Sequence, residues 1–149
     1  MTKKILKTIS IILIFGGLIY RYFLYIDFKN DCYIKLKPSF LELSSTNIKQ
    51  GIKILKLVSP DEYTKFCQHV KVINPNYACG GLGGGCYYSN NLEKKEIDIS
   101  TANGGYLGQT AAVIAHETCH AQQHQEGRDL NEQECYLVDD KVFKQIAEY

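Results

Sequence analysis

The sequence predicts an α+β domain, with helices packed on a small antiparallel sheet, that follows an N-terminal membrane-anchor helix. Three observations support this prediction. A cluster of lysines precedes an apolar run at the N-terminus. Most of the C-terminal half has the three- to four-residue apolar spacing of amphipathic helices. Between these helices, apolar residues alternate around a polar turn, as in a hairpin. At 149 residues the chain holds one domain, large enough to bury a core.

The N-terminus is expected to span a membrane. Residues 1–8 form a basic segment that should stay in the cytoplasm, and it contains Lys3, Lys4 and Lys7. Residues 9–26 are long enough to span a bilayer as a signal anchor, provided that Arg21 snorkels to the interface. No small-residue cleavage site follows, so we expect the anchor to remain uncleaved and residues 27–149 to lie outside the cytoplasm. A buried N-terminal helix of a soluble protein is the alternative.

The next elements are helical. Residues 27–44 form a transition, in which Pro38 prevents a continuous helix. From Ser45 one helix face carries Ile48, Ile52, Leu55 and Val58. The segment "SPDE" at 59–62 predicts the start of a second helix, with a serine cap, a proline at the first position and a capping-box glutamate. "NPN" at 74–76 should follow its end.

The second half begins with a hairpin. Five glycines between Cys79 and Cys86 indicate a tight loop. "CYYS" and "KEIDIS" then read as two strands around "NNLEK". After a break at 101–105, a long, mostly apolar helix should run from Tyr106 or Leu107 to a stop at Gly127. A last helix is expected from Glu132 to Tyr149.

Composition limits the classes of partner and the cellular compartment that we expect for this protein. The chain has 17 basic and 16 acidic residues and no long basic run, so no nucleic acid partner is expected. Six cysteines occur without any C-x-x-C pair, which argues against a zinc ribbon or a thioredoxin-like motif. An even number of such cysteines favours disulfides in an oxidising compartment. Six buried thiols in a cytosolic protein are the alternative.

The strongest chemical signal is an H-E-x-x-H pattern that begins at His116. On a helix, His116 and His120 lie one turn apart on the same face, where both imidazoles can bind one Zn²⁺. Zinc lowers the pKa of a bound water, and Glu117 is placed to take its proton as a general base. An incidental match on an exposed helix is disfavoured, because the preceding "AAVIA" is too apolar for a solvated face.

A third ligand should come from the following helix. His124 lies about 12 Å along the helix axis from His116, too far for the same ion. The next helix offers four carboxylates: Glu132, Glu134, Asp139 and Asp140. Glu134 is preferred because it adjoins Cys135, which is positioned to form a disulfide near the metal with the cysteine inside the motif. Glu132 is the second choice.

The segment "AHETCHAQQ", followed by "ECYLVDD", resembles the gluzincin branch of zinc metallopeptidases in its small, membrane-anchored bacterial forms. The likeness covers roughly residues 85 to 145. It implies a minimal zincin-like domain with one zinc ion, held by His116, His120 and Glu134, and with Glu117 as general base and acid. It also implies that an edge strand, "CYYS" or "KEIDIS", pairs with an extended substrate.

The resemblance implies a zinc-dependent metallopeptidase that hydrolyses peptide bonds of a peptide or protein substrate outside the cytoplasm. Tyr136 and His124 are candidates for stabilising the oxyanion. Two alternatives stay open. One is a zinc-binding pseudoenzyme or envelope interaction module, whose structural metal would have four protein ligands. The other is a zinc hydrolase for small molecules, which would need a closed pocket.

Six cysteines allow 15 pairings, and the residues favour one of them. The glycines between Cys79 and Cys86 let that loop close. Cys119 and Cys135 both adjoin predicted metal ligands and would hold the two helices together there. Cys32 and Cys67 are then left to pair with each other.

Overall fold

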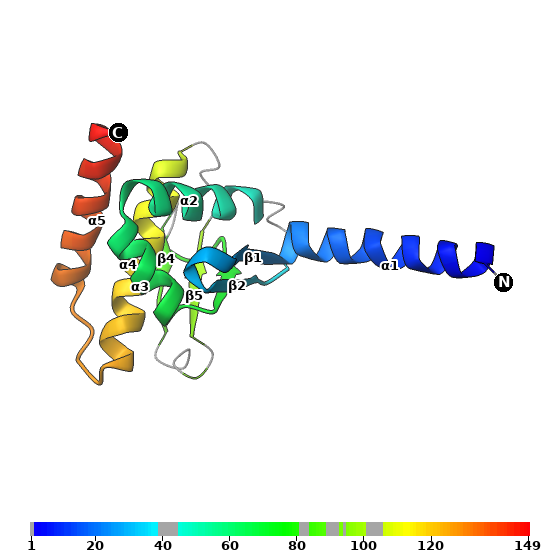
Figure 1. The fold of residues 1–149 in the computed structure, drawn as a ribbon. Helices are drawn as coiled ribbons and strands as arrows, with labels where there is room; N and C mark the ends of the chain where they lie inside the picture. Colours follow the sequence, from blue (N-terminus) through cyan, green and yellow to red (C-terminus); the bar gives the residue numbers. More distant parts are fainter. Residues whose placement is uncertain (1, 39–44, 81–83, 89–92, 94, 101–105) are drawn as a thin grey trace.

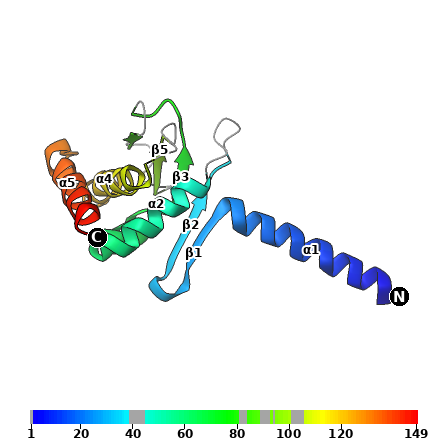
Figure 2. The ribbon, with the colours of Figure 1, turned by 90° about the horizontal axis from the view of Figure 1, so that it is seen from above.

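The computed structural model describes the whole chain except residues 1, 39–44, 81–83, 89–92, 94 and 101–105. The expected turn of "NNLEK" and the break at 101–105 therefore fall largely or wholly outside the described residues. Helix α1 (Thr2–Phe23) extends away from the rest of the molecule in both overall views (Figures 1 and 2). Its stretch Ile5–Phe23 is long and apolar enough to cross a membrane and is not buried inside the molecule, and only its C-terminal end contacts β1, β2 and α2.

Five strands form one mixed sheet in the order β1-β2-β3-β5-β4. The strands are β1 (Leu24–Asp27), β2 (Cys32–Leu36), β3 (Val72–Pro75), β4 (Gly85–Cys86) and β5 (Glu96–Ile99). The two outer pairs are antiparallel, and β2–β3 and β3–β5 are parallel. The expectation of an antiparallel sheet is therefore wrong for its centre. The physical reason is that two helices connect β2 to β3, and such a crossover returns the chain in the same direction.

Strand β1 takes the place of the end of the expected membrane segment, and β2 forms part of the expected transition. Helix α1 ends at Phe23 rather than at Ile26, because all four residues of β1 pair with β2. In β2 the residues alternate between buried and exposed, from Cys32 to Leu36. This period of two was a strand signal that the sequence contained.

The helices agree with the sequence analysis. They are α2 (Ser45–Val58), α3 (Pro60–His69), α4 (Leu107–Gln125) and α5 (Glu132–Glu148). Gly127 follows α4 with a left-handed φ of 71°, which glycine adopts without strain. The expected capping box at α3 is absent, since Ser59 makes no side-chain cap. Its glutamate, Glu62, is buried and instead accepts hydrogen bonds from Lys65 and Lys141.

Helix α4 lies at the centre of the domain. It contacts α2, α3, α5 and strands β4 and β5. Helices α2, α4 and α5 lie on the same side of the sheet (Figure 2). Small residues on α4, such as Ala111, Ala112 and Ala115, let these elements approach closely and are almost fully buried. Because three helices and two strands cover α4, polar side chains in its second half are buried as well.

Three disulfides connect the cysteines in the predicted pairs: Cys32–Cys67, Cys79–Cys86 and Cys119–Cys135. The first ties β2 to α3. The second closes the glycine loop beside β4. The third ties α4 to α5. With six cysteines bonded, the chain fits an oxidising compartment outside the cytoplasm.

A polar cluster around Asp27 fastens the first hairpin to the helices. The Asp27 carboxylate accepts hydrogen bonds at 2.6–2.7 Å from Lys56 of α2, Tyr63 of α3 and Asn30. The Tyr63 hydroxyl also lies 3.1 Å from that of Tyr25. The Lys56 ammonium, helped by the two neutral donors, holds the pKa of Asp27 well below its usual range.

We therefore expect Asp27→Asn to destabilise the protein in a pH-dependent way. A carboxyl group with a lowered pKa in the folded state contributes stability above its unfolded pKa of about 3.9, and this is lost as the pH falls. At pH 7 the variant should lower the midpoint of thermal unfolding by roughly 3–6 °C, and the difference should shrink below pH 4. Circular dichroism of the detergent-solubilised chain measures this. Asp140→Asn, which changes an exposed carboxylate on α5, is the control and should have little effect at either pH.

Candidate metal centre

Helix α4 presents the H-E-x-x-H residues toward β4 and α5. His116, Glu117 and His120 are each less than 10% exposed, so the helix buries three polar groups at one place. The two imidazoles lie one turn apart with their ring centroids separated by 4.9 Å. Their Nε2 atoms approach each other to 3.2 Å. The expectation that the two histidines share one face of a helix is confirmed.

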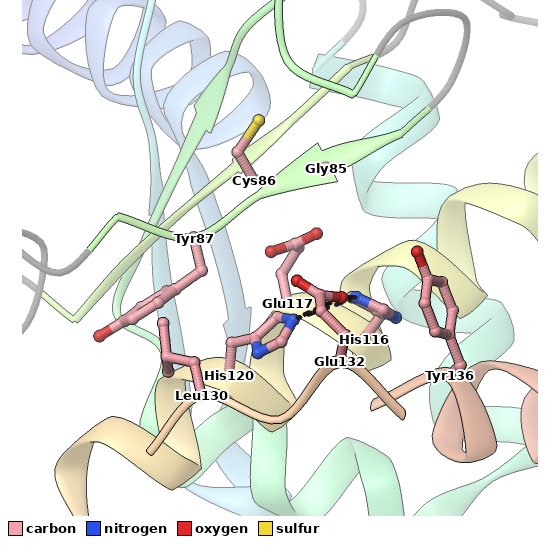
Figure 3. A pocket seen from close by; sticks show the side chains of 9 residues that line it. All are labelled: Gly85, Cys86, Tyr87, His116, Glu117, His120, Leu130, Glu132 and Tyr136. Atoms are coloured by element: carbon pink, nitrogen blue, oxygen red, sulfur yellow. Dashed lines mark hydrogen bonds and ion pairs between the residues drawn. The ribbon is translucent and has the colours of Figure 1, made fainter. Parts of the chain in front are cut away.

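A carboxylate of α5 completes a group of three possible ligand atoms. Oε2 of Glu132 lies 3.3 Å from Nε2 of His116 and 3.3 Å from Nε2 of His120. Figure 3 shows the three side chains converging below β4. Among the described residues this is the group of His, Cys, Asp and Glu side chains able to hold a metal ion.

The triangle of donor atoms fits zinc. Its edges are 3.2, 3.3 and 3.3 Å. Ligand bonds of about 2.0–2.1 Å in a tetrahedron place neighbouring donors about 3.3–3.4 Å apart. Two neutral imidazoles and one carboxylate are also a donor set that zinc accepts in catalytic sites. The residues present therefore fit a zinc ion without rearrangement of the two helices.

Glu134, the acid preferred from the sequence, lies elsewhere. Both of its carboxylate oxygens accept from Nη1 of Arg128, at 3.1 and 2.9 Å. The reason is helical geometry: residues two apart point about 200° away from each other. Cys135 faces α4, and on a helix the acid on its side is three residues back, not one. Glu132, the second choice, therefore reaches the histidines, and Glu134 does not.

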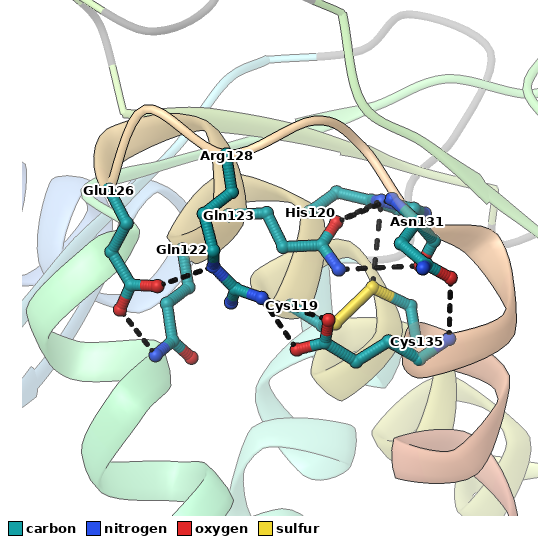
Figure 4. A network of polar contacts seen from close by, with 9 residues as sticks. Cys119, His120, Gln122, Gln123, Glu126, Arg128, Asn131 and Cys135 are labelled. Atoms are coloured by element: carbon teal, nitrogen blue, oxygen red, sulfur yellow. Dashed lines mark hydrogen bonds and ion pairs between the residues drawn. A yellow bond between two sulfur atoms is a disulfide. The ribbon is translucent and has the colours of Figure 1, made fainter.

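Neighbouring groups orient both imidazoles. The Nδ1 atom of His120 lies 3.3 Å from Oε1 of Gln123, and that oxygen also accepts from the backbone N–H of Asn131 (Figure 4). Nδ1 of His116 lies 3.3 Å from Oδ2 of Asp139. The acceptor beside Nδ1 of His120 favours the tautomer that leaves its Nε2 free for a metal. Nδ1 of His116 lies within ion-pair distance of Asp139 but forms no hydrogen bond with any described residue.

Gln123 also fixes the loop that carries the third carboxylate. It is fully buried, and its Nε2 donates to the carbonyl of Asn131, the residue before Glu132. The side chain of Asn131 in turn caps α5 by accepting from the backbone N–H of Glu134. The start of α5 is thereby held against α4 next to the histidines.

Glu117 is buried without a strong partner. One of its carboxylate oxygens has no hydrogen bond within the described structure. Burial raises the pKa of Glu117 to about 8; His116 opposes this shift, while Glu132, Asp139 and Asp98 add to it. Burial by itself lowers the pKa of His116, but Asp139, Glu117 and Glu132 outweigh it and raise that pKa. A carboxyl group that titrates near neutral pH is suited to exchange protons.

Gly85 leaves room for this carboxyl group. A Cβ atom built on Gly85 would lie 2.6 Å from Cγ and Oε1 of Glu117. Any larger residue at position 85 would therefore push the Glu117 side chain away. Nothing in the sequence distinguishes this glycine from the other four in its loop.

An open cavity of about 310 Å³ lies over the site. Gly85 and Cys86 of β4 form one wall, and Tyr87, Leu130 and Tyr136 flank it (Figure 3). Within the described part of the chain, β4 pairs only with β5, so its outer edge is unpaired beside the cavity.

The two oxyanion candidates differ in position. Tyr136 lies against His116, with ring centroids 5.0 Å apart, and is half exposed to the cavity. His124 is turned away from the histidine pair, because its Nδ1 lies 2.8 Å from the hydroxyl of Tyr87. His124 is thus not part of the ligand group, as its helical spacing predicted.

Comparison with known proteins adds no relative: no protein-family model, curated protein or solved structure matches this chain. The geometry of the site therefore carries the functional argument by itself.

Glu117 should make the stability of the metal-free protein depend on pH. Its pKa is higher in the folded state, so folding favours the neutral form, and stability should fall as the pH rises from about 4.5 to about 8. Glu117→Gln cannot ionise. With a chelator present, raising the pH from 5 to 9 should lower the midpoint of thermal unfolding by roughly 5–10 °C more for wild type than for this variant. Parallel pH curves for the two proteins would refute the assigned environment.

Proposed function

We propose that the protein is a zinc metallopeptidase of minimal zincin-like architecture, anchored in a membrane by α1, that cleaves peptides outside the cytoplasm. The observation that carries this proposal is the triangle of His116, His120 and Glu132 donor atoms with Glu117 buried beside it. The apolar α1 and the three disulfides support the location.

Each part of the site has a chemical task in this proposal. His116, His120 and Glu132 would hold the zinc ion. When bound, zinc supplies Lewis acidity that lowers the pKa of water and polarises a carbonyl group. Glu117 accepts a proton from the attacking water and delivers it to the leaving amide nitrogen. The positive charge of a bound zinc ion would lower the pKa of this buried carboxyl group and so favour the carboxylate form that accepts the proton. Tyr136 is the better placed of the two candidates to donate a hydrogen bond to the developing oxyanion, because it lines the cavity.

The cavity supports a peptide as substrate. The free edge of β4 offers backbone groups to an extended chain, in the manner of strand addition. The apolar and aromatic side chains of Tyr87, Leu130 and Tyr136 flank the same cavity and suit apolar residues of that chain. An open cavity with an edge strand also favours a peptide over the small-molecule substrate of the alternative hydrolase.

A structural zinc site is less well supported. It would require a fourth protein ligand. His124 is engaged with Tyr87, and the cysteines are bonded in disulfides, so the candidates for that role in the described chain are otherwise occupied. Three protein ligands beside an open cavity suit a catalytic ion.

Zinc content tests the ligand assignment. The purified full-length protein should contain about one zinc per chain, measured by plasma mass spectrometry, and His116→Ala should lose it. Glu132→Ala should weaken zinc binding at least tenfold. The matched control is Glu134→Ala, two residues away on the same helix, which should keep the metal because its carboxylate binds Arg128. Loss of zinc in Glu134→Ala but not in Glu132→Ala would overturn the assignment.

Proteolysis tests the reaction. We expect the zinc-loaded protein to cleave members of a proteome-derived peptide library, read by mass spectrometry. Glu117→Gln should retain zinc and lower cleavage about 100-fold or more, because it removes the proton acceptor. Absence of cleavage by a fully zinc-loaded wild type, across the library, would favour the non-catalytic alternative.

Gly85→Ala provides a second variant for the same assay. The added methyl group should displace the Glu117 carboxyl group while leaving the three metal ligands in place. Zinc content should stay at wild type and cleavage should fall tenfold or more. Gly17→Ala, whose added methyl group meets no atom within 4 Å, is the control.

A further inference from the structure

A second cavity lies at the other end of the molecule, where α1 joins the domain. It has a volume of about 420 Å³ and lies between the last turn of α1, strand β1 and helix α2. Three basic side chains, Arg21, Lys49 and Lys53, line it, and none of the described residues that line it is acidic. We propose that this basic pocket binds the phosphate group of an anionic phospholipid from the membrane that α1 enters.

No acidic side chain among the described residues neutralises the positive charges of the pocket. In the part of the chain that the structure describes, neither Arg21 nor Lys53 forms an ion pair. The ammonium of Lys49 donates to the backbone carbonyls of Tyr20 and Arg21, which end α1, so it is held in place without an acidic partner. Partial burial lowers the pKa of Lys49, and the charges of Lys53 and Arg21 add to this effect. A bound anion would reduce the electrostatic repulsion between these converging cations.

The position of the pocket indicates a lipid as the source of that anion. The apolar stretch Ile5–Phe23 has 19 residues, and at 1.5 Å per residue it is about 28 Å long, close to the hydrocarbon thickness of a bilayer. When this helix spans the membrane, its last turn with Tyr20 and Arg21 lies at the edge of the hydrocarbon, and from there the long side chains reach toward the lipid phosphates. Tyrosine and arginine are residues that favour this level.

The rest of the lining suits a lipid better than free phosphate. Leu24 and Ile26 of β1 and the ring of Tyr20 add apolar and aromatic surface beside the cations. Inorganic phosphate has nothing to place against such a surface, whereas the glycerol and upper acyl carbons of a phospholipid do. The pocket thus combines the two surfaces that a phospholipid presents at the interface.

A lipid held there would fix how the domain stands on the membrane. The pocket joins α1 to β1 and α2, so occupation would stiffen the junction between the anchor and the domain. Helix α5 and the metal centre lie toward the opposite end of the molecule from α1 (Figure 1). This arrangement would keep the centre facing away from the bilayer, and it does not depend on the proposed peptidase activity.

The test uses the full chain in nanodiscs of phosphatidylcholine with 20% phosphatidylglycerol, as the probe lipid, followed by native mass spectrometry of the released protein. Wild type should retain one phosphatidylglycerol per chain. One basic side chain near an anionic surface strengthens binding by about fivefold. Arg21→Gln and Lys53→Gln should each weaken retention by about that factor, and the double variant by about 25-fold. Lys49 is left intact, because it also holds the end of α1.

The control removes two charges elsewhere, with Lys29→Gln and Lys144→Gln, both exposed residues outside the pocket. It should retain the lipid as wild type does. Equal retention by the control and by the Arg21/Lys53 double variant would overturn the proposal. Displacement of phosphatidylglycerol by about 10 mM inorganic phosphate would also overturn it, because it would identify the site as one for free phosphate.

Discussion

The contact between α4 and α5 is the constraint on which the rest of the site depends. The Cys119–Cys135 disulfide joins the two helices with their Cα atoms 5.5 Å apart. Closing a loop of this length by a disulfide stabilises a fold by about 3 kcal/mol. More important here is direction: once Cys135 faces α4, residues three before it and four after it face the same way. Glu132 and Asp139 thereby meet His116, one at each side of its ring.

Burial of α4 determines the environment of Glu117. A helix covered by a sheet and three other helices places Glu117 where little water can solvate its charge, and this burial is the main cause of its raised pKa. The same close packing explains why Gly85 has to be small. The proposed proton acceptor and its free space are thus consequences of core packing, and the position of the candidate metal ligands is a consequence of the contact between α4 and α5. The junction at the far end, where Arg21 and Lys53 form no ion pair with any described residue, is built around the end of α1 instead.

Most helices could be predicted because their signals are local, whereas the Cys32–Cys67 disulfide, 35 residues apart, followed only once the other two pairs were assigned. Apolar spacing, a proline at the start of α3 and a glycine after α4 each act within a few residues. Three of the five strands were not predicted. They are four or five residues long, and their partners lie far away in the chain: β2 pairs with β3 across α2 and α3. A short strand that is buried by such distant neighbours carries little pattern of its own. Strand β2 was the exception, since its alternation was visible.

The sequence by itself determined that His116 and His120 share a helix face with Glu117 between them, because four residues complete about one helical turn. It also determined that an acid near Cys135 would approach them. Only the tertiary structure decided which acid does so, since the choice between Glu132 and Glu134 depends on how α5 is rotated against α4. The supporting roles of Gln123, Asp139 and Gly85 were decided there too. Each of these residues contacts a residue of another segment. Spacing within a single segment does not encode such contacts.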